Sequence, residues 1–391
     1  MGPMRPHTLA GWRRFRGSTG VATAMAVAAS VALGGCSLFS SSSSPTTVPR
    51  VSLAPSGSVG YVVCPNAVTP VELAKANTVE PDIPLPVSGI PAPGDFAIAT
   101  SPNGHWAYVV TSQQAAATPS SAPPTQNLVI PINLVTQRAG TPIVIPGTGS
   151  THSVVVFPDG STLVASSGTT LVPVDLTNDR VGTPLDLGTG HTVFGMVLNP
   201  AGSTLFALVT DAVIPVDTGH ASAGAPIPTG LTVSSVYSPH GIAISSDGST
   251  LYVVGQGGKD FGGRLLPITV ATGALQPETS FDQFGIASPA ALVVLPTNLA
   301  AYVVDSANNW VNPVVLNPVG APAPPIRLPA LVGVPGGTQH PSDIALGRDG
   351  VDTFIVDGFD SVVPFNTTSQ TFGRPLKVCT GASSMTIAPS P

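Results

Sequence analysis

The chain has 391 residues and a formal net charge of −6 at neutral pH. Lys, Arg, Asp and Glu make up only 9% of it and form no basic patch, which argues against a nucleic-acid partner. Glycine (42 residues) and proline (43 residues) together account for about a fifth of the chain. This composition is typical of many short strands joined by tight turns, and it favours an all-β protein.

Residues 1–35 are predicted to be a cleaved export signal. Four arginines precede an apolar stretch, 21–33, that is too short to span a membrane comfortably. The stretch ends in Leu-Gly-Gly-Cys36, which resembles the bacterial lipobox, and the resemblance implies that Cys36 is acylated and becomes the first mature residue. The alternative is an ordinary secretory signal that carries a cysteine. The pair Arg13-Arg14 leaves both the general and the twin-arginine export routes open.

Residues 36–58 are predicted to be a tether, because their serine, proline and threonine cannot bury a core. Two acyl chains on Cys36 would anchor the protein far more firmly than one chain. We therefore expect residues 59–391 to fold on the extracytoplasmic side of the cell membrane.

A three-strand unit recurs along residues 59–391. In Gly241–Thr272 two apolar runs flank the turn Asp247-Gly248, which predicts a β-hairpin, and a third run carries Pro267. Such third runs recur seven times, 42 to 61 residues apart, at Pro70, Pro131, Pro173, Pro215, Pro267, Pro313 and Pro364. Self-similarity at this period predicts one repetitive domain.

The hairpin recurs six times in step with the prolines, and the seventh copy is divided. Its second and third strands are expected at 61–63 and 68–73, whereas a lone first strand, 385–388, ends the chain. Pairing of these segments would close a ring and leave no long exposed edge. We therefore expect a seven-bladed β-propeller with one blade split between the two ends of the chain.

The segment IAISSDGSTLYVV (242–254) resembles the YVTN repeat of surface-layer and lactonase-like seven-bladed β-propellers. The resemblance covers about 59–388 and implies the same fold, with lactone hydrolysis as an activity known in the family. The chain departs from the repeat in its third strand, which carries proline, and at the position of the repeat's asparagine, which is replaced by Cys64, Thr111, Gly255, Asp305 or Asp357. Because proline interrupts a strand ladder, we interpret the seven prolines as a repeated bulge.

Cysteine usage agrees with an exported ring. With Cys36 acylated, Cys64 and Cys379 remain as an even pair in a compartment where disulfides persist. Both belong to the same end of the split blade, and we expect a disulfide between them.

Candidate functional residues gather where first strands begin and second strands end. Alignment of the hairpin turns places His152 and His240 at equivalent positions, and His191 and His340 a few residues upstream in equivalent turns. Catalytic candidates are His152, His240, His340, Asp305 and Asp357; tentative ligands of a divalent metal are His152, His191 and His240. We favour the alternative that these are polar loop residues capping strands, because no two stand at a metal-motif spacing, and we predict no cofactor.

Three functions fit this sequence. The first is a binding or scaffold lipoprotein whose partner is the cell membrane, through Cys36, together with an envelope polymer or a protein. The alternative is a lactonase-like or other hydrolase with its site on the channel face, and the third is a structural envelope protein. The fold alone does not choose among them.

Overall fold

The computed structural model describes residues 59–73, 78–87, 96–114, 125–147, 149–233, 241–258, 262–285, 288–316, 319–329 and 340–388. The predicted export signal, Cys36 and the tether to residue 58 lie outside the described residues, as does His240. No helix within these described ranges is long and apolar enough to cross a membrane.

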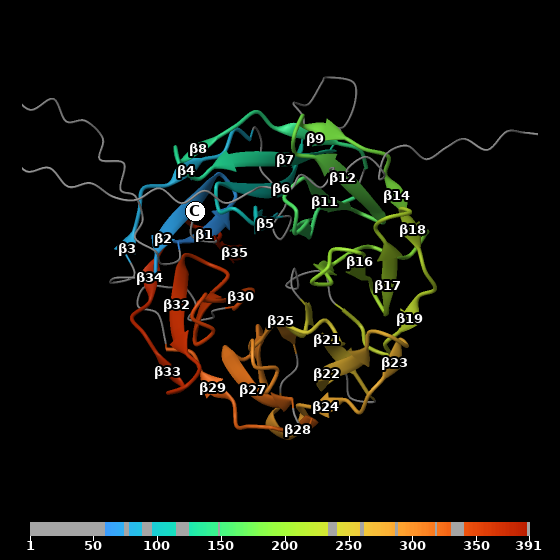
Figure 1. The fold of residues 1–391 in the computed structure, drawn as a ribbon. Coiled ribbons are helices and arrows are strands. Elements are labelled where there is room, and N and C mark those ends of the chain that lie inside the picture. Colours follow the sequence, from blue (N-terminus) through green and yellow to red (C-terminus); the bar gives the residue numbers. More distant parts are fainter. Residues whose placement is uncertain are drawn as a thin grey trace, which may run out of the picture.

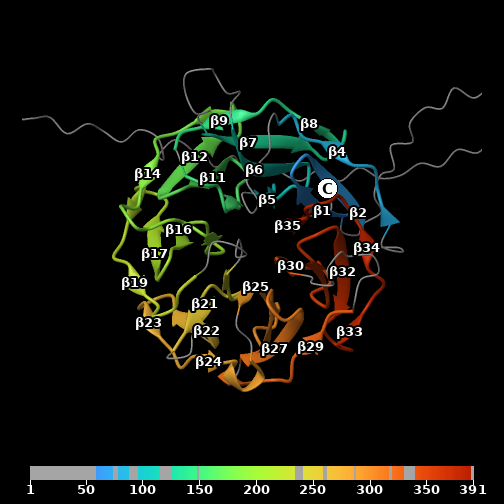
Figure 2. The same cartoon turned by 180° about the vertical axis from the view of Figure 1, so that it is seen from behind.

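Seven five-stranded antiparallel sheets stand around a common axis like the blades of a propeller (Figures 1 and 2). The innermost, first strands are β35 (Ser384–Ile387), β5 (Phe96–Thr100), β10 (Val154–Val156), β15 (Gly195–Leu198), β20 (Ile242–Ile244), β25 (Pro289–Val294) and β30 (Asp343–Leu346). The second strands are β1 (Val59–Cys64), β6 (Trp106–Gln114), β11 (Thr162–Ser167), β16 (Thr204–Leu208), β21 (Thr250–Gly257), β26 (Ala300–Asp305) and β31 (Asp352–Val356). In the order just given, we number the blades 1 to 7.

The third strand of each blade carries the repeated proline. These strands are β2 (Ala67–Glu72), β7 (Thr125–Asn133), β12 (Thr170–Asp175), β17 (Ala212–Asp217), β22 (Gly262–Thr269), β27 (Trp310–Leu316) and β32 (Ser361–Asn366). The outermost strand of each blade is divided into two short pieces: β3 (Thr78–Val79) and β4 (Ile83–Pro84), β8 (Arg138–Ala139) and β9 (Ile143–Ile145), β13 (Arg180–Val181) and β14 (Leu185–Asp186), β18 (Ser222–Ala223) and β19 (Ile227–Pro228), β23 (Ala274–Leu275) and β24 (Thr279–Ser280), β28 (Val319–Pro322) and β29 (Ile326–Arg327), and β33 (Thr371–Phe372) and β34 (Leu376–Lys377). A short 3-10 helix, η1 (Asp282–Phe284), follows β24.

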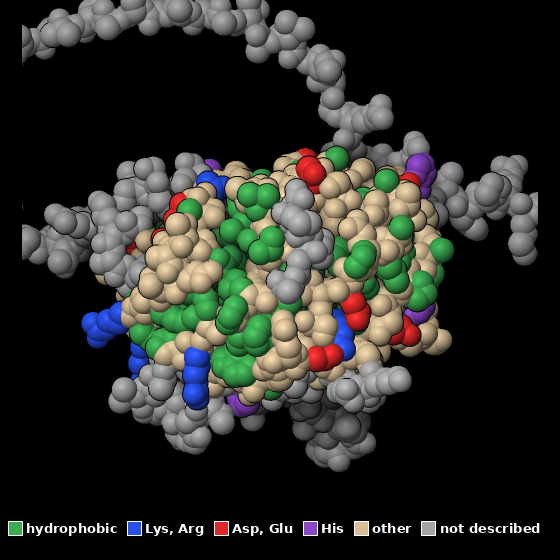
Figure 3. All heavy atoms as spheres, turned by 90° about the horizontal axis from the view of Figure 1, so that it is seen from below, with side chains coloured by type: hydrophobic (Ala, Val, Ile, Leu, Met, Phe, Trp, Pro, Cys, Tyr) green, Lys and Arg blue, Asp and Glu red, His purple; other side chains and the backbone are tan. Residues whose placement is uncertain are grey.

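The hydrophobic core lies between neighbouring blades. Val164 and Leu171 of blade 3, for example, pack in one cluster with Leu205 and Ile214 of blade 4. Aliphatic side chains on both faces of each sheet are needed for this arrangement, which explains the dense valine, isoleucine and leucine runs. On the side of the ring that Figure 3 shows, a few Lys and Arg side chains are scattered over a surface that is mostly hydrophobic or uncharged.

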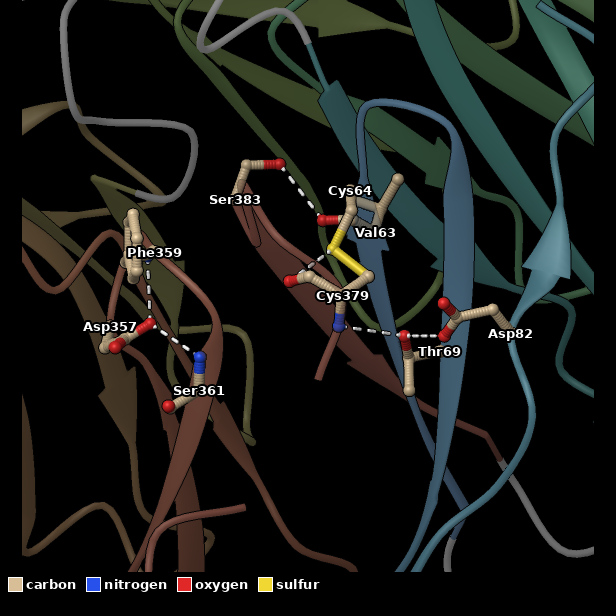
Figure 4. The surroundings of a disulfide bond; sticks show 9 residues. All are labelled: Val63, Cys64, Thr69, Asp82, Asp357, Phe359, Ser361, Cys379 and Ser383. Atoms are coloured by element: carbon tan, nitrogen blue, oxygen red, sulfur yellow. Dashed lines mark hydrogen bonds between the residues drawn. A yellow bond between two sulfur atoms is a disulfide. The ribbon is translucent and has the colours of Figure 1, made fainter. Parts of the chain in front are cut away.

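The split blade closes the ring, as predicted. Strand β35 pairs with β1 from Gly60↔Ile387 to Val63↔Ser384, and β35 also contacts the first strands β5 and β30 of both neighbouring blades. A disulfide joins Cys64 to Cys379, whose Cα atoms are 6.1 Å apart (Figure 4). The prediction of seven blades with one divided copy is therefore confirmed.

The prediction of a repeated bulge at the prolines is wrong. The ladder between second and third strands runs without a register shift through every proline, which lies opposite Tyr61, Tyr108, Val164, Phe206, Tyr252, Tyr302 or Phe354. The irregularity lies one strand further out, where the fourth strand is divided.

The break in the fourth strand explains why proline is tolerated. The carbonyl of Pro173 accepts a hydrogen bond from Gly182 N at 2.8 Å, and all seven prolines accept an equivalent bond from the outer segment. Since a strand residue directs its N–H and C=O to the same side, the missing N–H also faces outward, where the fourth strand is interrupted. The outer segment packs closely there, because a Cβ built on Gly182 would lie 3.1 Å from the ring of Pro173.

Candidate functional site

The end of the ring where first strands begin and second strands end is called the loop face, and the opposite end is called the hairpin face. Asp159 lies on the hairpin face, where its Oδ1 accepts a hydrogen bond from Ser161 N and Gly160 adopts a φ of 70°. Asp247 and Asp349 make equivalent bonds in their own turns. These aspartates are turn residues, as the dipeptide pattern predicts.

His152 opens the first strand of blade 3 on the loop face. Its side chain is buried, and its ring lies 5.7 Å from that of Phe194 in blade 4, tilted by 34°. Its backbone N–H donates to Ser166 Oγ at 3.0 Å. His152 is therefore part of the contact between blades 3 and 4, at the end of the ring that forms the loop face.

A buried polar network lies beside His152 and joins blades 2 and 3. The amide of Asn127 donates to the carbonyl of Gly149 at 2.7 Å and to Ser167 Oγ at 2.6 Å. Its oxygen accepts from Ser112 Oγ at 2.9 Å. These atoms satisfy one another's hydrogen bonds, so the network ties the two blades together.

His191 lies in the turn that leads into blade 4, three residues before Phe194. Its Nδ1 is 2.7 Å from the carbonyl of Leu187, and because a carbonyl can only accept, Nδ1 carries the proton. In its neutral form the ring therefore has its lone pair on Nε2, the arrangement that imidazole ligands and proton acceptors use. The predicted coincidence of His152 with His240 stays a prediction, since His240 is outside the described residues.

His340 lies elsewhere on the loop face, between blades 6 and 7. Its backbone N–H donates to the carbonyl of Asp357 at 3.1 Å, and its Nδ1 is 3.1 Å from the carbonyl of Ser306. His340 thus links the ends of two second strands. The structure groups His152 with His191 at blades 3 and 4, and His340 with Asp305 and Asp357 at blades 6 and 7.

The two carboxylates of this second group hold their own turns. Asp305 accepts from Ala307 N at 3.0 Å through Oδ1 and from Asn308 Nδ2 at 2.7 Å through Oδ2. Asp357 accepts from Phe359 N and Ser361 N, both at 2.9 Å, through Oδ1. Both residues are fully buried.

Burial raises the pKa of the Asp357 carboxyl, and the nearby charge of Asp360 raises it further, while the backbone N–H groups of Phe359, Ser361 and Asp360 oppose the shift. Its Oδ2 is buried and has no hydrogen-bond partner among the described residues. Asp357 is therefore the loop-face carboxyl best suited to holding a proton.

Metal binding by these residues stays a prediction. Within the part of the chain that the structure describes, no three His, Cys, Asp or Glu side chains form a group that could hold a metal ion. The close imidazole–carboxylate pair, His220 Nδ1 with Asp217 Oδ2 at 2.7 Å, is exposed and lies on the hairpin face. There the hydrogen bond from His220 lowers the pKa of Asp217.

A buried arginine in blade 5 was not among the residues predicted from the sequence. Arg264 donates to both oxygens of Asp282, at 2.6 and 2.7 Å, and to Glu278 at 3.2 Å. The hydrogen bonds with Asp282 raise the pKa of Arg264, and the hydrogen bonds from Arg264 lower the pKa of Asp282. The sequence alone distinguishes Arg264, because it stands three residues before the proline of its third strand, where the other six third strands carry Ala, Leu, Thr, Trp or Ser.

A second missed residue is Asp343, which is buried on the first strand of blade 7. Its Oδ2 accepts from Met385 N at 2.8 Å and from Ser384 Oγ at 3.1 Å, across the boundary with blade 1. The other blades carry Ala, Gly or Ser at this position, so the lone aspartate was visible in the alignment of copies. Its carboxylate ties the last strand of the chain to its neighbour.

No family model matches the chain, and no curated protein matches its sequence. Solved structures do match. A hydrazine synthase structure from Kuenenia stuttgartiensis is 16% identical with a TM-score of 0.60, over 78% of this chain and 93% of that one. A functionally unknown protein from Desulfotomaculum acetoxidans is 13% identical with a TM-score of 0.60, over 84% and 98%.

The β-propeller domain of Cps50 (Swd1) from Myceliophteria thermophila matches at 12% identity and a TM-score of 0.56, over 76% of this chain and 89% of that one. The chain is a seven-bladed β-propeller. At such low identity the likeness shows the fold alone, because propellers serve many unrelated functions. Membership of the YVTN-repeat family stays a prediction.

Proposed function

We propose that this propeller is an exported lipoprotein that acts as a binding or scaffold module at the cell envelope, and that its loop face meets an envelope polymer or a protein partner. One observation carries the proposal. Strand β1 begins at Val59 on the hairpin face, where it lies beside the end of β35. A tether ending at residue 58 therefore joins the ring opposite the loop face.

The reach of this tether suits an outward-facing ring. The 22 residues between Cys36 and Val59, if flexible, have a root-mean-square end-to-end distance of about 25 Å. The anchor would then hold the hairpin face toward the membrane and leave the loop face open to the envelope.

The hydrogen bonds of the loop face support binding more than catalysis. The described imidazoles of His191 and His340 are fixed by backbone carbonyls, and Asp305 and Asp357 are engaged in their own turns. Fixed polar groups on a rigid ring suit recognition, because little side-chain entropy is lost on binding.

The anchor is tested by replacing Cys36 with alanine in the expressing bacterium. We expect the wild-type protein to incorporate a labelled fatty acid and to sediment with membranes, and the Cys36→Ala chain to do neither. A Cys36→Ala chain that remains fatty-acylated and in the membrane fraction would contradict the proposed anchor.

The binding face is tested with two matched double variants. His191→Ala/His340→Ala alters the loop face, and His105→Ala/His220→Ala alters the hairpin face by the same chemistry. We expect co-sedimentation of the purified mature protein with isolated cell-wall polymer to weaken only in the loop-face variant. Equal weakening in both variants would contradict the assignment of the face. If the wild type hydrolyses lactones and the loop-face variant does not, the protein is an enzyme rather than a binding module.

Metal binding is tested on the same protein by calorimetric titration with Zn²⁺ and with Ca²⁺. We expect neither heat of binding nor a rise in the unfolding temperature. Saturable heat that disappears in His191→Ala/His340→Ala would make a metal part of the site.

A further inference from the structure

The turn 357–361 of blade 7 holds the chain segment that leads into the last strand. The carbonyl of Phe359 accepts hydrogen bonds from Gly381 N at 2.5 Å and Ala382 N at 3.0 Å, and the carbonyl of Asp360 accepts from Val378 N at 2.7 Å. The three donors, Val378, Gly381 and Ala382, lie within three residues of Cys379, whose disulfide to Cys64 is drawn in Figure 4 together with Asp357 and Phe359. The turn is therefore part of the seam that closes the ring.

Asp357 sets the shape of this turn. Its Oδ1 accepts from Phe359 N and Ser361 N, and its backbone carbonyl accepts from His340 N. Its side chain is fully buried, yet its Oδ2 has no partner among the described residues. A buried, unpaired carboxylate oxygen is costly, whereas a neutral carboxyl group is less so.

The equivalent aspartate of blade 6 shows what blade 7 lacks. Asp305 ends its second strand at the same position, and Asn308, three residues later, donates to its Oδ2 at 2.7 Å. Three residues after Asp357 stands Asp360, which when ionised cannot donate and instead adds negative charge. Blade 7 thus has Asp360 where blade 6 has Asn308, and Oδ2 of Asp357 lacks the donor that Oδ2 of Asp305 has.

The other charged or titratable groups on the elements around Asp357 interact with partners other than its carboxyl group. Asp360 is within 3.6 Å of Lys377 Nζ on β34. The ring of His340 is directed at Ser306, and Asp343 on β30 bonds Ser384 and Met385. Asp357 is thus the group in this set with an unpaired, fully buried oxygen.

We propose that Asp357 is a proton-binding latch of the ring's seam, which takes up a proton from solvent as the pH falls and thereby holds turn 357–361 more firmly on segment 378–384. Proton uptake converts the carboxylate to a carboxyl group, removes the buried charge and leaves the two backbone bonds to Oδ1 in place. Burial and the neighbouring Asp360 both raise the pKa of Asp357 in support.

The dependence of seam closure on pH follows from the difference in the pKa of Asp357 between the closed and the opened form. Because the pKa is raised in the folded seam, the closed form binds more protons than the opened form between the ordinary carboxyl pKa and the raised one. Closure is therefore strongest at the acidic end of that window and weakens as pH rises through the folded pKa. One proton changes the opening equilibrium by up to about tenfold per pH unit.

The experiment follows amide hydrogen exchange of segment 378–388 in the oxidised mature protein, corrected for intrinsic rates, with 154–167 of blade 3 as the internal reference. We expect protection of 378–388, relative to the reference, to rise as pH falls from 8 toward 4 in the wild type. In Asp357→Asn we expect it to be independent of pH. Equal pH dependence in wild type and Asp357→Asn would overturn the proposal.

Asp360→Asn provides a second variant that does not alter the buried carboxyl. It supplies the amide that blade 6 has at Asn308, so we expect the rise in protection to move to lower pH. A transition that stays at the wild-type pH in Asp360→Asn would also overturn the proposal.

Discussion

Blade 1 and blade 3 have the same strand pairing, although blade 1 is assembled from the two ends of the chain. The ladder β1–β2 and the ladder β11–β12 each pair six residues, with Pro70 opposite Tyr61 and Pro173 opposite Val164. The burial of each strand repeats position by position. In blade 3 the turn at Asp159-Gly160 joins the first two strands, whereas blade 1 has no such turn and a disulfide at the other end.

The difference teaches that the register of a blade does not depend on its hairpin. The side-chain pattern favours this pairing of β35 with β1, because a slip of one residue would exchange the side chains that pack against the two neighbouring blades. What the hairpin supplies in blade 3 is chain connectivity, which lowers the entropy lost on folding. The disulfide supplies the same constraint in blade 1.

The largest effect is expected when that constraint is removed. The double variant Cys64→Ala/Cys379→Ala should lower the free energy of unfolding by up to about 5 kcal/mol, because the bond closes a loop of 315 residues in the unfolded chain. Urea unfolding of the mature protein measures it, and reduced wild-type protein should show the same loss. Stability equal to that of the oxidised wild type would mean that pairing alone closes the ring.

A matched pair of core substitutions compares the packing of the two blades. Val71 in blade 1 and Val174 in blade 3 follow their prolines directly, and both are fully buried. Val71→Ala and Val174→Ala should each cost about 2 kcal/mol, within about 0.5 kcal/mol of each other. A much smaller cost for Val71→Ala in the same urea titration would show that the split blade is loosely packed.

Tyrosine titration compares the split blade with blade 2. Burial raises the pKa of Tyr61 to about 12, and burial together with the charge of Asp179 raises that of Tyr108 to about 12. Since the folded form holds these protons, stability is unaffected at neutral pH and falls as pH rises from about 10 to about 12. The tyrosinate absorbance lost in Tyr61→Phe and in Tyr108→Phe assigns the two groups. A lower pKa for Tyr61 would place solvent between blades 1 and 2.

The smallest effect is expected at the surface of the seam. Lys377 is 83% exposed and lies 3.6 Å from Asp360, so the pair is screened by water. Lys377→Ala should therefore change the free energy of unfolding by less than about 0.5 kcal/mol. A loss above about 1 kcal/mol in urea unfolding would mean that this ion pair contributes to ring closure.

The repeat made the fold readable from the sequence. Seven prolines in equivalent third runs, such as Pro173 and Pro215, count the blades, and the lone strand near Met385 reveals the split copy. The cause of the proline pattern was not readable, because it depends on where the outer strand breaks.

The candidate site was less predictable, because its geometry comes from contacts between blades. Alignment of copies placed Asp305 and Asp357 at one position, but their different hydrogen bonds depend on Asn308 and Asp360 in the following turns. Arg264 and Asp343 stood out from their copies and still required the structure to show their partners.

The central claim is that the two ends of the chain form one blade and are covalently joined there. The most direct test is mass-spectrometric mapping of the unreduced mature protein after proteolysis. The structure predicts one cross-linked peptide pair containing Cys64 and Cys379, with no free thiol at either residue. Recovery of both peptides as free thiols, or either of them bonded to another chain, would contradict the account.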